Sequence, residues 1–111
     1  MRMVQSISRD DLKARIDDGS IAVIEALPAE YYEQGHLPGA LNLPHDQVDD
    51  LAPRLLPDKS AAVAVYCANS ACANSGLAAD RLQELGYTQV FTYGPGKQDW
   101  ADGGLPTEIN A

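Results

Sequence analysis

Short apolar runs alternate along the chain with longer segments whose apolar residues recur at helical spacing. The runs at residues 21–26 and 61–66 are evenly apolar, which is typical of strands buried on both faces of a parallel sheet. Residues 88–93 are rich in β-branched and aromatic residues and predict a third strand. Leu41 and Leu43, which lie among prolines and a glycine, predict a minimal edge strand.

Helices are predicted between these strands. Ser8 is placed to cap the first helix, which Gly19 ends. The segments expected to form the others are residues 28–35, with one or two turns, residues 46–57, residues 75–86, with Leu77, Leu82 and Leu85 on the apolar side, and one turn around Trp100. Strands that alternate with helices through short loops predict an α/β fold: a mostly parallel sheet flanked by helices on both faces. A chain of 111 residues has the size of one ordinary domain, so we expect a single domain over residues 1–111.

Composition narrows the possible partners. The formal net charge is -8 and only eight residues are Lys or Arg, which argues against nucleic acids and anionic membranes. No apolar stretch approaches the ~20 residues of a membrane span, and the first ten residues lack the pattern of a signal peptide. We therefore expect a cytoplasmic protein.

The two cysteines, Cys67 and Cys72, are the clearest candidates for chemistry. Cys67 directly follows a predicted strand and precedes a predicted helix, at the sheet edge where α/β proteins place their sites. Loop amides and a helix N-terminus lower the pKa of a thiol from ~8.5 toward about 3.5 to 7.5. The alternative is that Cys67 is a small buried apolar residue and Cys72 fills a turn. The cysteines and the two histidines do not form a paired metal-ligand pattern, so neither a metal nor another cofactor is expected.

Three features in this order resemble the rhodanese-like domain family along almost the full chain. They are "EYYEQGHLPGALNLP" after the first strand, the cysteine that ends the central strand, and a Trp followed by a small loop and Gly-Leu-Pro. The resemblance implies a sulfurtransferase or sulfur carrier whose Cys67 takes sulfur from a small-molecule or protein persulfide donor and passes it to a thiol acceptor. It also implies that backbone amides of the loop stabilise the persulfide. These would come from Ala68, Asn69, Ser70, Ala71, Cys72 and Ala73.

The chain departs from the family pattern at its charged positions. Glu25-Ala26-Leu27 stands where the family usually has Asp-x-Arg. When the resemblance is anchored on the following helix, Ser75 takes the place of the family's loop serine, the loop is two residues longer than usual, and Asn74 stands where the family usually has a basic residue. The loop "CANSACANS" thus lacks a charge-assisted anchor for a dianion, so thiosulfate should be a weak donor and phosphatase activity is excluded. The alternative function is a non-catalytic binding or thiol redox-sensing module that uses Cys67 and Cys72. Their spacing of five in a small-residue loop predicts that oxidation joins them in a disulfide.

Four further residues have competing interpretations. His36 is expected to make a structural hydrogen bond, and His45 to lie on the surface. Glu25 either accepts hydrogen bonds from loop N–H groups or caps the neighbouring turn. Trp100 is expected to fill the core.

Overall fold

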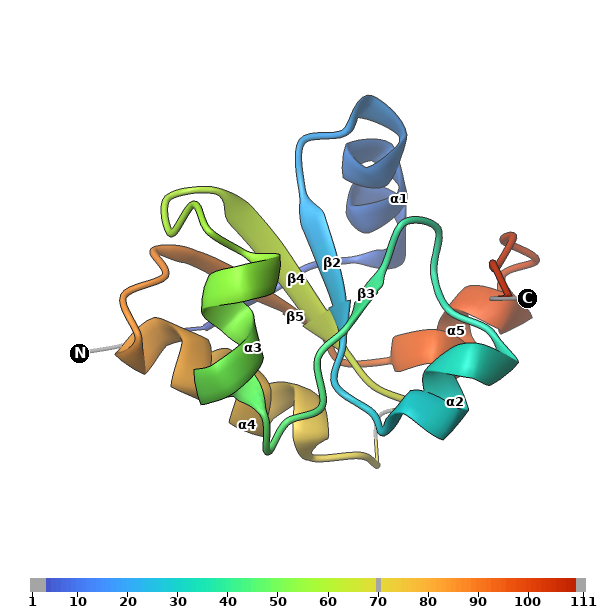
Figure 1. Ribbon diagram of the computed structural model, residues 1–111. Helices are drawn as coiled ribbons and strands as arrows, with labels where there is room; N and C mark the ends of the chain where they lie inside the picture. Colours follow the sequence, from blue (N-terminus) through green and yellow to red (C-terminus); the bar gives the residue numbers. More distant parts are fainter. Residues whose placement is uncertain (1–3, 70, 110–111) are drawn as a thin grey trace.

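The computed structural model describes residues 4–69 and 71–109, which form a five-stranded parallel sheet with helices on both faces (Figure 1). The strand order is β1-β5-β4-β2-β3, so β4 is central. The strands are β1 (Gln5–Ser6), β2 (Ala22–Glu25), β3 (Leu41–Asn42), β4 (Ala62–Tyr66) and β5 (Gln89–Tyr93). The helices are α1 (Arg9–Asp18), α2 (Ala29–Gln34), α3 (Val48–Leu55), α4 (Asn74–Glu84) and α5 (Gly96–Asp102). The predicted α/β class is confirmed.

The register aligns the carboxyl ends of the three middle strands. Glu25 in β2 pairs with Tyr66 in β4, which in turn pairs with Tyr93 in β5. Each strand stops at this row, so the segments that follow them gather at one edge of the sheet. Cys67, the residue after β4, therefore lies in the middle of that edge.

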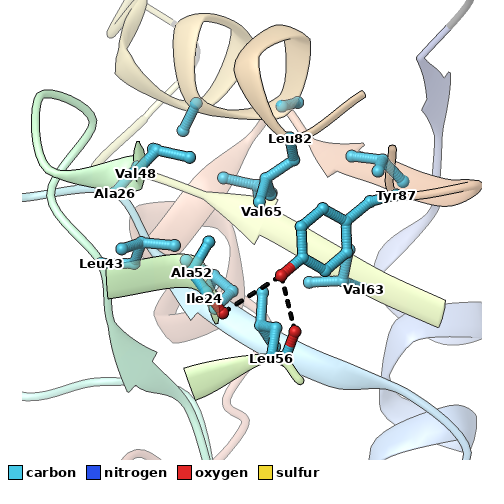
Figure 2. Close-up of a cluster of buried hydrophobic side chains, with 13 residues drawn as sticks. Ile24, Ala26, Leu43, Val48, Ala52, Leu56, Val63, Val65, Leu82 and Tyr87 are labelled. Carbon is cyan, nitrogen blue, oxygen red and sulfur yellow. Dashed lines mark hydrogen bonds between the residues drawn. The ribbon is translucent and has the colours of Figure 1, made fainter. Parts of the chain in front are cut away.

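The two faces of the sheet have different cores. Figure 1 shows α3 and α4 together on one side and α1 and α5 on the other. The α3/α4 core is mainly aliphatic, and its Tyr87 hydroxyl lies 3.1 Å and 2.6 Å from the carbonyl oxygens of Ala52 and Leu56 (Figure 2). The α1/α5 core contains Tyr66, Tyr93 and Trp100. Alternation along β4 divides its side chains between these two cores.

The predicted caps of the first helix are confirmed. The Ser8 hydroxyl accepts a hydrogen bond from the N–H of Asp11 at 3.1 Å, which satisfies a free donor of the first turn. Gly19 ends α1 with a φ of 73°, in the left-handed region that favours glycine. These local signals mark the two ends of α1, and Leu12 packs it against the core.

Two details differ from the sequence prediction. Leu77 is 53% exposed, because the buried stripe of α4 consists of Ser75, Ala78, Ala79 and Leu82, and Leu77 lies off it. Strand β1 was not predicted, because its two residues are both exposed and carry no apolar pattern. It joins the sheet through its pairing with β5.

None of the helices in the described part of the chain combines the length and apolar character that a membrane crossing requires.

Candidate active site

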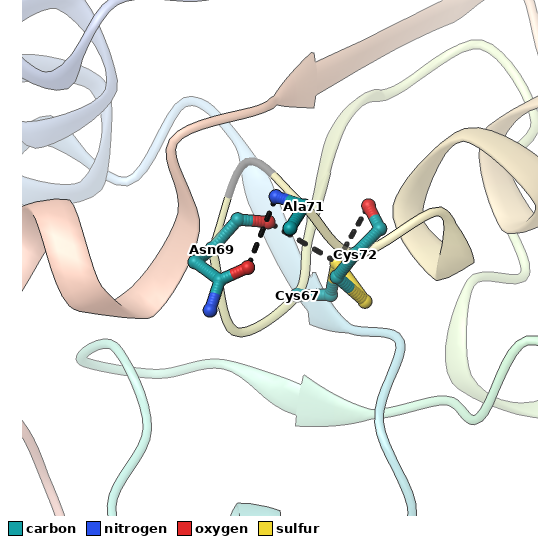
Figure 3. The surroundings of a disulfide bond; sticks show 4 residues. All are labelled: Cys67, Asn69, Ala71 and Cys72. Atoms are coloured by element: carbon teal, nitrogen blue, oxygen red, sulfur yellow. Dashed lines mark hydrogen bonds between the residues drawn. A yellow bond between two sulfur atoms is a disulfide. The ribbon is translucent and has the colours of Figure 1, made fainter.

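The loop between β4 and α4 holds both cysteines (Figure 3). Cys67 leaves the central strand, and α4 begins at Asn74. The loop therefore connects a buried strand to the N-terminus of an 11-residue helix. This position supports the sequence-based choice of Cys67 as the candidate nucleophile.

Cys67 and Cys72 are joined by a disulfide, with their Cα atoms 6.4 Å apart. This separation lies within the ~4.4 to 6.8 Å that disulfides span. The disulfide predicted from the spacing of the two residues is therefore confirmed. Cys67 is 0% exposed in this form, whereas Cys72 is partly exposed. The closed loop is the form in which a donor has no access to the Cys67 sulfur.

Asn69 organises the described part of the loop. Its backbone carbonyl accepts a hydrogen bond from the N–H of Cys72 at 3.1 Å, and its side-chain oxygen accepts one from the N–H of Ala71 at 3.0 Å. The Sγ atom of Cys67 lies 3.4 Å from the carbonyl oxygen of Cys72. In the disulfide form, two of the predicted cradle amides thus bind Asn69.

The cradle itself stays a prediction. Of its members, Ala68, Asn69, Ala71, Cys72 and Ala73 lie in the loop around Cys67, whereas Ser70 lies outside the described residues. An open loop would have to turn their amides toward the sulfur to stabilise an anion there.

The start of α5 packs directly against the start of the loop. The N–H of Lys97 donates to the carbonyl of Cys67 at 2.8 Å, and the N–H of Gln98 donates to that of Ala68 at 2.9 Å. Gly96 has a φ of +74°, and a Cβ atom built there would lie 2.4 Å from the Cys67 carbonyl oxygen. Only glycine meets both conditions without displacing the backbone of Cys67.

A buried charge lies beside Cys67 at the carboxyl end of β2. Glu25 is 0% exposed, and its Oε1 atom accepts a hydrogen bond from the Tyr66 hydroxyl at 2.7 Å. The ammonium group of Lys97 pairs with the same oxygen at 3.0 Å. The Tyr66 hydroxyl in turn accepts a hydrogen bond from the N–H of Leu37 at 3.1 Å. Burial, reinforced by the negative charge of Glu25, raises the pKa of Tyr66 well above its usual value.

Glu25 therefore serves neither of the roles predicted for it, since its described side-chain partners are Tyr66 and Lys97 instead of loop N–H groups or a turn. The pairing of β2 with β4 explains why Tyr66 meets it. Sequence reasoning missed Tyr66 and Lys97. The ends of adjacent parallel strands offered a signal for Tyr66, but Lys97 lies in the first turn of α5, after a glycine-rich segment whose path had no such signal.

The remaining candidates are structural. The Nδ1 atom of His36 lies 3.0 Å from the carbonyl oxygen of Tyr32, and the two rings stack with centroids 3.9 Å apart, so the structural interpretation of His36 is confirmed. Trp100 is 1% exposed and donates to the carbonyl of Pro106 at 2.8 Å, which confirms its place in the core. His45 was expected on the surface but is half-buried.

An open depression of about 190 Å³ lies beside the loop. It is lined by Asn69, Pro95, Gln98, Asp99 and Asp102. The Asp99 carboxylate accepts a hydrogen bond from the Tyr93 hydroxyl and pairs with Arg9 at 3.3 Å. The depression thus presents acidic side chains to any molecule that approaches the loop from this side.

Known proteins share this architecture. Residues 8–102 match the family model described as "Rhodanese-like domain". The chain is 39% identical over 71 residues to the thiosulfate sulfurtransferase PspE of Escherichia coli, covering 64% of this chain and 66% of that protein. It is 28% identical over 106 residues to the HTH-type transcriptional regulator Rv0324 of Mycobacterium tuberculosis, covering 96% of this chain and 46% of that protein. The chain thus spans less than two thirds of the length of these curated relatives.

The solved structures agree with the match. The crystal structure of the BH2092 protein from Bacillus halodurans is 25% identical and superposes with a TM-score of 0.87. The match covers 95% of this chain and 77% of that one. The parallel sheet and its helices are therefore those of a recurrent fold.

Proposed function

Because the chain belongs to the rhodanese-like domain family, we propose that it is a cytoplasmic sulfurtransferase or sulfur carrier that forms a persulfide on Cys67. The observation that carries the proposal is the position of Cys67, between the central strand and the N-terminus of α4. The helix end favours the thiolate, so we expect the pKa of reduced Cys67 to lie below the ~8.5 of a free thiol.

The reaction has two balanced steps. The Cys67 thiolate attacks the outer sulfur of a persulfide donor, forms a new S–S bond and releases the donor thiolate. A thiol acceptor then attacks the outer sulfur of the Cys67 persulfide, takes it away and restores the Cys67 thiolate. Donor and acceptor are small molecules or proteins of this chemical class.

The charges around the loop favour a persulfide over thiosulfate. Between Cys67 and Asn74 the sequence contains no Lys or Arg, and the adjacent depression carries Asp99 and Asp102. The nearby ammonium group of Lys97 is paired with buried Glu25. A dianion therefore meets repulsion without a compensating anchor, whereas a donor with less charge at its reacting end does not.

A donor series tests this proposal. Thiosulfate, glutathione persulfide and an inorganic polysulfide are offered in turn to the reduced protein, with cyanide as acceptor, and kcat/KM is measured for each. We expect glutathione persulfide to exceed thiosulfate by about tenfold or more, and Cys67→Ser to remove all activity. Activity retained in Cys67→Ser would disprove the role of Cys67, and a highest kcat/KM with thiosulfate would disprove the charge argument.

A second candidate function is a thiol redox sensor whose loop is read by a partner. The disulfide favours it, because a bond between Cys67 and Cys72 is a chemical state of the loop that a partner could distinguish from the reduced state. The similarity to a transcriptional regulator also supports it. After mild peroxide, mass spectrometry should show a loss of two hydrogens in the wild type and sulfinic Cys67 in Cys72→Ser. Direct formation of sulfinic Cys67 in the wild type would contradict this function.

A further inference from the structure

The disulfide shows that the chain itself carries a second thiol within bonding reach of Cys67. Cys72 Sγ is bonded to Cys67 Sγ, the atom that would become the inner sulfur of a persulfide. The loop therefore adopts a conformation in which the sulfur of Cys72 reaches the sulfur of Cys67. An external acceptor would have to approach a residue that is 0% exposed in this conformation.

We propose that Cys72 resolves the Cys67 persulfide, so that the protein releases sulfane sulfur as hydrosulfide, an activity that rests on the proposed persulfide at Cys67. The Cys72 thiolate attacks Cys67 Sγ and forms the Sγ–Sγ bond. The bond between Cys67 Sγ and the outer sulfur breaks, and the outer sulfur leaves as HS⁻. The proton from Cys72 goes to solvent. The two thiols are oxidised to a disulfide, and the sulfane sulfur is reduced to sulfide.

Hydrogen bonds within the loop and an acidic side chain beside it favour disulfide formation and the release of hydrosulfide. Hydrogen bonds from the N–H groups of Ala71 and Cys72 to Asn69 hold the turn that brings Cys72 back to Cys67. Asp102 borders the depression beside Asn69, where Asp99 is paired with Arg9, and the negative charge of Asp102 disfavours the retention of HS⁻. The closed disulfide is then the product of sulfur release and also protects Cys67 from a second donor.

A thiol reductant resets the cycle. Cys72 is partly exposed and Cys67 is buried, so the reductant attacks Cys72 Sγ and Cys67 leaves as the thiolate. A second thiol then frees Cys72 and leaves the reductant as its disulfide. A low pKa at Cys67 favours this direction, because a more acidic thiol is the better leaving group. The substrates of the whole cycle are thus a persulfide donor and a dithiol or two thiols.

A single-turnover experiment without oxygen tests the inference. Reduced wild-type protein and Cys72→Ser are each mixed with one equivalent of glutathione persulfide, with no other thiol present. Hydrosulfide is then trapped and quantified, and the intact mass of each protein is measured. The donor without protein gives the hydrosulfide that it releases alone, and Cys67→Ser gives the amount released without Cys67; each is subtracted. Cys72→Ala repeats the measurement without the serine hydroxyl.

We expect the wild type to release hydrosulfide in stoichiometric amount and to lose two hydrogens. Cys72→Ser and Cys72→Ala should gain one sulfur atom and release hydrosulfide only after a dithiol is added. If the wild type keeps its persulfide as long as Cys72→Ser does, the inference is wrong and the proposed persulfide chemistry stands. If neither protein gains sulfur or releases hydrosulfide, the proposed function fails and the inference fails with it.

Discussion

The ends of β2 and β4 lie side by side at one edge of the sheet, yet they carry opposite kinds of residue. At the end of β2, Glu25 is fully buried and fixed by Tyr66 and Lys97. After β4, Cys67 enters a loop of small residues that contains no charged side chain up to Asn74. The charged pair of Glu25 and Lys97 therefore has a structural role at this edge of the sheet. The chemistry of the loop depends instead on the cysteine sulfur atoms and on backbone groups.

The largest expected effect on stability comes from the contact between Gly96, at the start of α5, and the backbone of Cys67. Gly96→Ala places a Cβ 2.4 Å from the Cys67 carbonyl oxygen and imposes an unfavourable φ of +74°. We expect a loss of about 2 to 4 kcal/mol in the free energy of unfolding, from backbone strain and overpacking together. Urea denaturation of the reduced protein measures it.

Gly94→Ala is the matched control for that change. Gly94 precedes the same helix, and a Cβ built there meets no atom within 4 Å. We expect its effect to stay within about 0.5 kcal/mol, as for an ordinary surface substitution. Equal midpoints for Gly96→Ala and Gly94→Ala would show that α5 does not constrain the loop.

Removing one or the other member of the Glu25–Lys97 ion pair should lower the free energy of unfolding by different amounts. Lys97→Met leaves the carboxylate of Glu25 buried without its cation, and we expect a loss of about 2 to 3 kcal/mol. This is less than for a fully buried pair, because Lys97 is 22% exposed. Glu25→Gln should cost only about 1 kcal/mol, since Tyr66 keeps a hydrogen-bond partner and Lys97 can reach water. Equal losses in the two variants would contradict the assigned burial.

Alkaline pH should lower the free energy of unfolding, because Tyr66 and Tyr93 are buried. Burial, with Glu25 and Asp99 adding negative charge, raises the pKa of Tyr66 and of Tyr93. In the unfolded protein a tyrosine has a pKa of ~10. At lower pH the tyrosines are neutral in both the folded and the unfolded protein, so folding keeps its full stability; at higher pH they ionise only in the unfolded protein, which favours unfolding. Stability should therefore fall by about 1 to 2 kcal/mol between pH ~9 and ~10.5. The slope of urea midpoints against pH should be smaller in Tyr66→Phe, and an unchanged slope would count against this source.

The smallest expected effect comes from adding a positive charge to the loop. Asn74→Arg restores a cation at the N-terminus of α4, where the family usually has a basic residue. We expect thiosulfate kcat/KM to rise about tenfold, through a charge-assisted hydrogen bond, with little change for glutathione persulfide. Asn74→Gln is the neutral control. A rise with both donors would show that charge in the loop does not set donor choice.

The sequence predicted most of the architecture because the signals were local. Capping at Ser8, termination at Gly19 and the apolar runs of β2 and β4 each act within a few residues. Strand β1 carried no such signal, because its two residues are exposed and take their place only by pairing with β5. Leu77 was misplaced because α4 buries small residues, Ser75, Ala78 and Ala79, together with Leu82, and Leu77 lies off that stripe.

The candidate site was predictable only in part. The location of Cys67 and its disulfide with Cys72 followed from a strand end and a spacing. The role of Glu25 did not, because it depends on Lys97, far along the chain in α5, and on the hydroxyl of Tyr66. Contacts that bring together residues far apart in the chain leave no periodic pattern in the sequence.

The central claim is that Cys67 takes up sulfane sulfur, and peptide mass spectrometry of Cys72→Ser tests it most directly. The reduced variant is mixed with glutathione persulfide without oxygen, alkylated and digested. The account predicts one added sulfur atom, located on the peptide that contains Cys67 and removed by a dithiol. A Cys67 peptide that carries only the alkyl group after exposure to the donor would contradict it.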